Sequence, residues 1–527
     1  MRAENPAGDE VRDARQRLVS DILRLQARRS PDKVALVYEG QKDTYADLER
    51  LVSRFANRLI AMGVGPGDRV AILSHNNRAF VLARFGIIRA GAVFTPINFM
   101  LNAAEVRYVL DHARPVAIIS EDALCAIADE ALSGLANPPR IKAYIRHTGA
   151  AVPVGWDDIE DWLAHPDDST PAVSRGEDDP VQLMYTSGTE SHPKGAMLSS
   201  RNLFAQYVSC AIDGHMAADD VDLHCLPLYH CAQLDCFLSV DLYLGATSIL
   251  MRAPDVGKML EMIEAEKVTK LFCPPTVWIA LLRHPDFDTR DLTSLKKGYY
   301  GASVMPVAIV EELVRRLPGM GLWNFYGQTE MAPVATILQP EEQLRKLGSA
   351  GRPAINVETS VVDDDGRPVA VGEVGEIVHR GSQVMLGYYL DEAKTREAFR
   401  GGWFHSGDLG RFDEEGYLYL VDRKKDMIKS GGENVASREV EEVLFKHPDV
   451  QEAAVFGIPD EKWIEAVTAV VVARPGVTAD VASIEAHCRT HLAGYKRPKA
   501  IHLAESLPKN ASGKILKREL RERYVPQ

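Results

Sequence analysis

Hydrophobic and polar positions along the first half of the chain alternate between a helical period and a strand period. After Thr44, apolar side chains recur every three or four positions, which predicts an amphipathic helix with Thr44 as N-cap and Asp47 three residues on. A glycine-rich turn ends this helix, and a short strand (RVAILS) follows. A second helix, from Asn77 to Gly91, leads into another strand (AVFTPIN). Such β-α-β alternation predicts mostly parallel sheets covered by helices.

The pattern changes further along the chain. Residues 120–178 are rich in Pro, Asp and Ala, and predict peripheral structure. Between 348 and 387, short strands with tight turns (DDDGRP) predict a small antiparallel, β-barrel-like unit. We therefore expect an α/β fold: a large N-terminal domain of helix-covered, mostly parallel sheets (1–421) that carries this unit, a charged hinge (422–425), and a small mobile α+β C-terminal domain (426–527).

Composition narrows the class of protein. The formal net charge is −13, from 74 acidic against 61 basic side chains, which disfavours non-specific nucleic-acid binding. The first residues are charged rather than apolar, and the most apolar window, 237–251, is shorter than the roughly 20 residues that span a bilayer. We expect a cytoplasmic protein without a transmembrane segment, and the sequence leaves a homodimer open.

The seven cysteines are scattered, with no CxxC pair. Cys225, Cys231 and Cys236 lie near His224 and His230, which raises the alternative of a zinc site. Their spacing differs from that of known zinc sites, and therefore favours small, buried, reduced thiols.

A polar loop after an apolar strand (VQLMY) is the strongest local signal for phosphate binding. Its hydroxyl and glycine positions, which can surround phosphate oxygens, are Thr186, Ser187, Gly188 and Thr189. Lys194 adds a positive charge. Pro193 occupies the second glycine position of a Walker A motif, and Gly195 replaces its Ser/Thr, so a conventional P-loop NTPase is disfavoured. Alone, the segment fits a polar surface loop equally well.

Two further segments change this picture. The stretch 324–330 (NFYGQTE) places an aromatic ring for stacking on a purine, a hydroxyl for the α-phosphate, and Glu330 for Mg²⁺. The stretch 402–410 (GWFHSGDLG) places Asp408 on a glycine-flanked turn, where a carboxylate suits the two hydroxyls of a ribose. Each piece is weak alone, and together they indicate a nucleotide site.

Four further segments accompany these three: LPLYHCAQL, GYYGASVMP, DRKKDMIKSGGEN and PKNASGKILKREL. All seven stand in the order in which one known superfamily carries its motifs. The chain thus resembles the acyl-adenylate-forming superfamily from about Leu36 to Leu520. This superfamily includes acyl-CoA synthetases, 4-coumarate–CoA ligases, firefly luciferase and peptide-synthetase adenylation domains. The resemblance implies an ATP-dependent acid–CoA ligase that uses Mg²⁺ and takes a carboxylic acid, ATP and CoA as substrates. Within this superfamily, the sequences of the motifs SGGEN and DRKKDMI most resemble those of the fatty-acyl-CoA synthetase branch.

The resemblance also implies roles for individual residues. The ATP-binding residues would be Thr186, Ser187, Gly188, Thr189, Lys194, Gly301, Ala302, Tyr326, Gly327, Gln328, Thr329, Glu330, Asp408, Arg423 and Lys514. Glu330 and Thr186 would hold Mg²⁺. Lys514 would be the catalytic lysine that spans the acid carboxylate and the α-phosphate. Two departures from the family pattern stand out. Glu190 and Ser191 replace Thr-Gly in the phosphate loop, and Tyr300 replaces the glycine or small residue before Gly-Ala.

The second half-reaction would use a different set. Lys425 would be the hinge residue, and Lys429, Gly431 and Gly432 would swing in to bind CoA, with Lys429 acting in thioester formation. His230 would be a catalytic gate beside the acid carboxylate. The acid pocket would be lined by His230, Cys231, Tyr300, Gly301, Phe325, Met331 and Ala332.

This lining is apolar and has no basic residue for a second carboxylate, which favours a monocarboxylic acid. We expect a medium- or long-chain fatty acid, with a hydroxycinnamate- or benzoate-type acid as the alternative. Tyr300, in place of a small residue, argues against a deep acyl tunnel. A carrier-protein loader, a luciferase, a phosphotransferase that forms ADP and a non-catalytic nucleotide sensor are the competing hypotheses.

Overall fold

The structure is a computed structural model, and it describes residues 11, 14–149, 154–186, 193–303, 305–430, 433–509 and 515–525. Several residues with predicted roles lie outside these described residues: Ser187, Gly188, Thr189, Glu190, Ser191, Gly431, Gly432 and Lys514. Among the described residues, no helix is long and apolar enough to cross a membrane.

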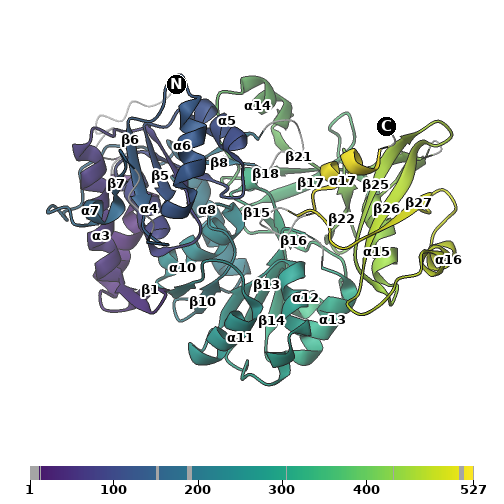
Figure 1. The fold of residues 1–527 in the computed structure, drawn as a ribbon. Coiled ribbons are helices and arrows are strands. Elements are labelled where there is room, and N and C mark those ends of the chain that lie inside the picture. The colour runs from purple at the N-terminus through teal and green to yellow at the C-terminus, as the bar shows by residue number, and fades with distance from the viewer. Residues whose placement is uncertain are drawn as a thin grey trace.

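An eight-stranded, mostly parallel sheet is built largely from the first two hundred residues (Figure 1). Its strands, in spatial order, are β19 (Gly387–Tyr388), β9 (Gly195–Ser199), β8 (Pro180–Tyr185), β4 (Val93–Ile97), β3 (Arg69–Leu73), β5 (Ala117–Glu121), β6 (Ile141–Ile145) and β7 (Asp157–Asp158). Among the strands that the structure describes in this sheet, only the pairs β19–β9 and β8–β9 are antiparallel. The predicted strands RVAILS and AVFTPIN are β3 and β4, side by side and parallel.

A nine-stranded sheet forms the second layer of the large domain. Its strands, in order, are β16 (Arg352–Pro353), β15 (Val334–Leu338), β14 (Gly321–Gly327), β13 (Lys297–Gly301), β12 (Lys270–Phe272), β10 (Val221–His224), β11 (Thr247–Leu250), β1 (Val34–Tyr38) and β2 (Gln41–Thr44). The run from β14 to β1 is parallel, and antiparallel strands close both ends. The expectation of mostly parallel sheets is confirmed.

Helices cover both sheets. They are α2 (Ile22–Arg29), α3 (Tyr45–Ala61), α4 (Arg78–Arg89), α5 (Ala103–Ala113), α6 (Cys125–Ser133), α7 (Ile159–Leu163), α8 (Ser200–Asp213), α9 (Cys231–Gln233), α10 (Ser239–Leu244), α11 (Val256–Ala265), α12 (Pro275–Arg283), α13 (Val307–Arg316) and α14 (Glu392–Ala398). The predicted Thr44 cap is confirmed, since Thr44 and Asp47 form a reciprocal capping box at the start of α3.

Close packing of α3 on α4 fixes the core of the large domain. A Cβ added to Gly86 on α4 would lie 2.3 Å from the ring of Phe55 on α3, so a glycine lets the two helices approach. The ring of Trp162, on α7, packs edge-on against Phe55 with centroids 5.4 Å apart. The segment 120–178 thus supplies edge strands β6 and β7 and also a fully buried indole.

The small antiparallel unit is also present. It contains β17 (Glu358–Val362), β18 (Gly375–Arg380), β20 (Phe399–Arg400), β21 (Trp403–Phe412) and β22 (Leu418–Arg423). Among the described residues these strands pair in the order β17-β18-β21-β20, with β22 also on β21, which is an open sheet. The unit continues to Arg423, beyond the expected end at residue 387.

A fourth sheet occupies the rest of the chain, at the right of Figure 1. It contains β23 (Ile428–Ser430), β24 (Glu433–Val435), β25 (Val450–Asp460), β26 (Ile464–Ala473) and β27 (Ala500–Ala504). Its helices are α15 (Ser437–Phe445), α16 (Val481–His491) and α17 (Lys517–Tyr524). A hydrophobic cluster that includes Val440, Val455 and Val471 forms its own core. This arrangement matches a small α+β unit, and its boundaries and mobility stay predictions.

Candidate active site

The predicted phosphate loop leaves the eight-stranded sheet between β8 and β9. The backbone N–H of Thr186 donates to the carbonyl of Lys194 at 2.9 Å, which closes the base of the loop. The Lys194 ammonium lies 5.3 Å from the ring centroid of Tyr388. The two ends of the loop are therefore held at one edge of the sheet, with a cation beside them.

Tyr326, Asp408 and Arg423 come together from two different sheets. The Tyr326 hydroxyl donates to Asp408 Oδ2 at 2.8 Å, and Arg423 Nε lies 3.2 Å from Asp408 Oδ1. Asp408 and Arg423 face each other on the paired strands β21 and β22. Burial, and then the Asp408 carboxylate, raise the pKa of Tyr326 well above its ordinary value, so the phenol stays a donor.

The ends of β13 and β14 lie side by side and bring two predicted segments into contact. Gly301 pairs with Phe325, and a Cβ at Gly301 would lie only 2.4 Å from the Phe325 carbonyl oxygen. Ala302, directly after, has a positive φ of 62°. Only glycine fits at position 301, which leaves a flat backbone edge where the sequence predicts an adenine.

Glu330 has a partner that the sequence did not indicate. Its Oε1 accepts a hydrogen bond from the Tyr388 hydroxyl at 2.8 Å, and its backbone carbonyl accepts from Met385 N at 2.8 Å. Tyr388 lies on β19, which pairs with β9 directly after the phosphate loop. The same ring thus touches the predicted Mg²⁺ carboxylate through its hydroxyl and Lys194 through its face.

The segment after β10 joins the predicted acid pocket to the predicted nucleotide-binding residues Gly301, Tyr326, Thr329, Asp408 and Arg423, which we call the nucleotide edge. His230 is the N-cap of α9, its Nδ1 accepting from Ala232 N at 3.2 Å. The Sγ of Cys231 lies 3.3 Å from the Thr329 hydroxyl. Burial raises the pKa of Cys231 to about 12, so its thiol stays protonated, and in the predicted pocket it would be part of the wall rather than a nucleophile.

The remaining pocket residues are buried behind this contact. Phe325 stacks with Phe237 at a centroid distance of 5.8 Å and meets Tyr299 edge-on at 5.3 Å. The Tyr300 hydroxyl donates to Gln343 Oε1 at 2.9 Å, inside the protein. Met331 and Ala332 are buried as well. Aromatic rings therefore fill the space behind the predicted pocket.

The CoA-binding set is only partly described. Lys429 is exposed on β23, where its backbone N–H donates to Glu465 Oε2 at 2.6 Å. Lys425 follows Arg423 in the turn after β22. Contact of Lys429 with the nucleotide edge stays a prediction, as do the roles of the residues outside the described part of the chain.

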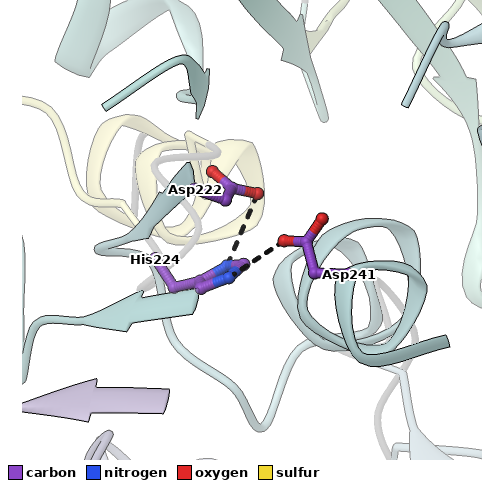
Figure 2. Close-up of side chains that lie close together, drawn as sticks. All are labelled: Asp222, His224 and Asp241. Atoms are coloured by element: carbon purple, nitrogen blue, oxygen red, sulfur yellow. Dashed lines mark ion pairs between the residues drawn. The ribbon is translucent and has the colours of Figure 1, made fainter. Parts of the chain in front are cut away.

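The proposed reduced thiols are all buried and free, whereas His224 has other partners. Figure 2 shows His224 between Asp222 and Asp241, with Nε2 3.2 Å from Asp241 Oδ2 and Nδ1 3.9 Å from Asp222 Oδ2. The Lys270 ammonium pairs with both carboxylates. A lysine thus supplies the cation in this buried group, and its acceptors are carboxylates rather than the cysteines of the zinc alternative.

Comparison with known proteins extends over most of the chain. The family described as AMP-binding enzyme matches residues 23–389, and the AMP-binding enzyme C-terminal domain matches 439–514. A feruloyl-CoA synthase of Amycolatopsis sp is 40% identical over 503 residues, which cover 95% of this chain and 97% of the relative. The long-chain-fatty-acid–CoA ligase FadD13 of Mycobacterium tuberculosis is 36% identical, covering 95% and 98%.

Solved structures agree with the sequence comparison. The crystal structure of an anthranilate–CoA ligase in complex with anthranoyl-AMP has a TM-score of 0.89 at 27% identity, and covers 97% of this chain and 98% of that one. The match spans both the nucleotide edge and the C-terminal sheet. The chain belongs to the family of AMP-binding enzymes and is an AMP-forming acid–CoA ligase.

Proposed function

We propose that this ligase activates an aryl acid of the hydroxycinnamate type. The observation that carries the proposal is the aromatic packing behind Phe325, together with 40% identity to a feruloyl-CoA synthase. A planar ring can stack against such a wall, whereas a long alkyl chain needs a tunnel beyond it. We therefore favour the aryl-acid alternative over the expected medium- or long-chain fatty acid. The similarity to FadD13, a long-chain-fatty-acid–CoA ligase, is the observation that supports a fatty acid.

The first half-reaction joins two anions. A carboxylate oxygen of the acid attacks the α-phosphorus of ATP, the bond to the bridging oxygen breaks, and pyrophosphate leaves. Positive charge placed where the new anionic centre develops lowers such a barrier. We assign this charge to Lys514, and Lys194 and the Thr186 loop to the β- and γ-phosphates.

The nucleotide itself is held by the edge described above. Asp408 accepts from Tyr326 and pairs with Arg423, so its carboxylate is oriented before a ribose arrives. Thr329 lies 3.3 Å from Cys231, and we assign to this contact the place where the α-phosphate and the acid carboxylate meet. Orientation before binding reduces the entropy cost of bringing the two substrates together.

Glu330 and Thr186 fit a Mg²⁺ ion by donor chemistry, since both offer oxygen and Glu330 is buried and held by Tyr388. When bound, the ion would neutralise charge on the leaving pyrophosphate. Tyr388 holds the Glu330 carboxylate, and the Thr186 hydroxyl donates to the Lys194 carbonyl at 3.4 Å.

In the second half-reaction, the CoA sulfur attacks the acyl carbon, AMP leaves and the thiol proton is released. Lys514 would stand in the path of the thiol. A rotation at Lys425 would remove it and bring Lys429 and the glycines 431 and 432 alongside the pantetheine arm.

The test is a panel of acids with product analysis. The purified chain should release AMP and pyrophosphate, with the highest kcat/KM for ferulate and p-coumarate, lower values for benzoates, and the lowest for C12–C18 fatty acids. The highest kcat/KM with a fatty acid would refute the aryl assignment. Formation of ADP would refute adenylation, and transfer to a carrier protein but not CoA would identify a loader.

A further inference from the structure

A buried group of ionisable side chains lies next to residues 225–232, which carry His230 and Cys231 and which we call the acid-binding segment. Asp222 on β10, Asp241 on α10 and Lys270 on β12 surround His224, the last residue of β10, and all four side chains are fully buried. Asp222 and Lys270 face each other on neighbouring parallel strands. Burying four ionisable side chains is costly unless they are paired, so their arrangement needs a reason.

Gln233 determines which nitrogen of His224 accepts a hydrogen bond. Gln233 Oε1 accepts from Leu226 N at 3.3 Å, so Gln233 Nε2 is the atom that donates to His224 Nδ1 at 2.7 Å. With Nδ1 accepting, the ring N–H is on Nε2, which lies 3.2 Å from Asp241 Oδ2. The Lys270 ammonium holds Asp241 in place from the other side.

Gln233 also contacts the acid-binding segment. Its Oε1 accepts from Leu226 N at 3.3 Å, inside the protein. His224 and Gln233 therefore close the segment 225–232, which carries His230 and Cys231, at its two ends. A π-helical turn, Leu234–Leu238, follows at once and leads to Asp241 in α10.

A second clamp holds the middle of the same segment. Asn76 Nδ2 donates to the Leu226 carbonyl at 2.8 Å, and Asn76 Oδ1 accepts from Leu228 N at 2.8 Å. Lys270 also lies 5.9 Å from the ring of Phe237, which stacks on Phe325 in the pocket wall. The buried group is thus linked to the predicted pocket by two sets of contacts. One is the hydrogen bond between His224 and Gln233, and the other is the packing of Lys270 on Phe237 and of Phe237 on Phe325.

We propose that the Asp222–His224–Asp241–Lys270 group is a positioning device for the acid-binding segment, acting through the hydrogen bond from Gln233 to His224 Nδ1. It sets the place of His230 and Cys231 relative to Thr329, and so determines acid affinity and selectivity without touching the acid. The proposal rests on the assignment of this segment to the acid pocket.

A matched pair of variants tests whether the hydrogen bond from Gln233 Nε2 to an acceptor at the place of His224 Nδ1 is required. In His224→Asn the amide oxygen falls near the place of Nδ1 and can still accept from Gln233. In His224→Gln the longer amide reaches toward Asp241 and leaves Gln233 without its acceptor. KM is measured separately for acid and for ATP by pyrophosphate release, with the acid that the wild type uses best.

We expect His224→Asn to keep the acid KM within about twofold, and His224→Gln to raise it about tenfold, with the ATP KM within about twofold in both. The ratio of kcat/KM between ferulate and benzoate should also fall in His224→Gln. A merely structural role would lower the thermal midpoint and the active fraction without separating the two KM values.

Gln233→Met is the second variant, because it leaves all four ionisable side chains intact and is expected to fold. It should reproduce the rise in acid KM. Equal shifts of the acid and ATP KM, or an unchanged acid KM in both His224→Gln and Gln233→Met, would overturn the proposal. Failure of the aryl assignment shows separately, as a different preferred acid in the wild type.

Discussion

Two regions of this ligase place acidic side chains beside a cation, and they do so in opposite surroundings. At the nucleotide edge, Asp408 pairs with Arg423, whose side chain keeps 35% of its surface exposed. Beneath the acid-binding segment, Asp222, Asp241 and Lys270 are sealed from solvent. The first pair is partly open to a ligand, whereas in the second group one ammonium, that of Lys270, pairs with both carboxylates beside His224.

The difference shows how the two kinds of polar site are used. A site that takes up an anionic nucleotide needs a path to solvent and donors that stay available. A buried ionic group has no such path, so its contribution is to fix geometry, and its loss leaves an uncompensated charge. The following experiments separate these roles, from the largest expected effect to the smallest.

Removing the mobile cation should have the largest effect. Lys514→Ala should reduce acyl-AMP formation by about 10²–10³-fold, because no positive charge would meet the developing anion. Thioester formation from supplied acyl-AMP should be retained, and serves as the internal control. The measurement is single-turnover pyrophosphate release, and an unchanged adenylation rate would contradict the assignment.

Locking the hinge should affect the other half-reaction. Lys425→Pro fixes φ near −65° and should slow thioester formation from supplied acyl-AMP on the order of 100-fold while adenylation continues. Lys425→Ala, which keeps the backbone free, is the matched control. If Lys425→Pro makes acyl-CoA at the wild-type rate, domain rotation at this position is not required.

The hydrogen bond between the Tyr388 hydroxyl and Glu330 can be tested by removing that hydroxyl. Tyr388→Phe deletes the hydrogen bond to Glu330 Oε1, and a bond to a charged group contributes about 1.5–3 kcal/mol. The Mg²⁺ concentration for half-maximal ATP binding should rise about tenfold or more, measured by calorimetry. Tyr389→Phe, on the neighbouring ring that packs against His112, is the control and should change little. Equal Mg²⁺ dependence in both variants would show that the hydroxyl is dispensable.

The carboxyl group of Asp222 should make the stability of the folded chain depend on pH. Burial raises the pKa of Asp222 to about 7, although the Lys270 ammonium opposes this. The folded chain therefore keeps a proton that the unfolded chain releases above its ordinary pKa of about 3.9. The free energy of unfolding should fall between about pH 4 and 7, by at most about 1.4 kcal/mol per pH unit.

Asp222→Asn removes this titration and preserves the shape of the side chain. Urea unfolding of the two proteins across this range measures the difference in their slopes. Parallel pH profiles would mean that Asp222 is ionised throughout, and that the charge of the buried group is balanced in another way.

Much of the fold was predictable because its signals are local. The Thr44 cap, the helix from Asn77 and the strands on either side of it depend on residues within a few positions of one another. The reaction class was predictable because seven ordered motifs match one family. The bond between Tyr388 and Glu330 was not, because the two residues are 58 positions apart and no pattern relates them.

The sequence by itself therefore determined the alternation of helices and strands and the family, since each follows from neighbouring residues or a motif, and the roles of the residues at the nucleotide edge stay predictions. Only the tertiary structure decided that His224 lies between two carboxylates and a lysine, and that Gln233 and Asn76 clamp the acid-binding segment. Those contacts depend on the order in which strands β10, β11 and β12 pair, and pairing between distant segments is set by packing rather than by local preference.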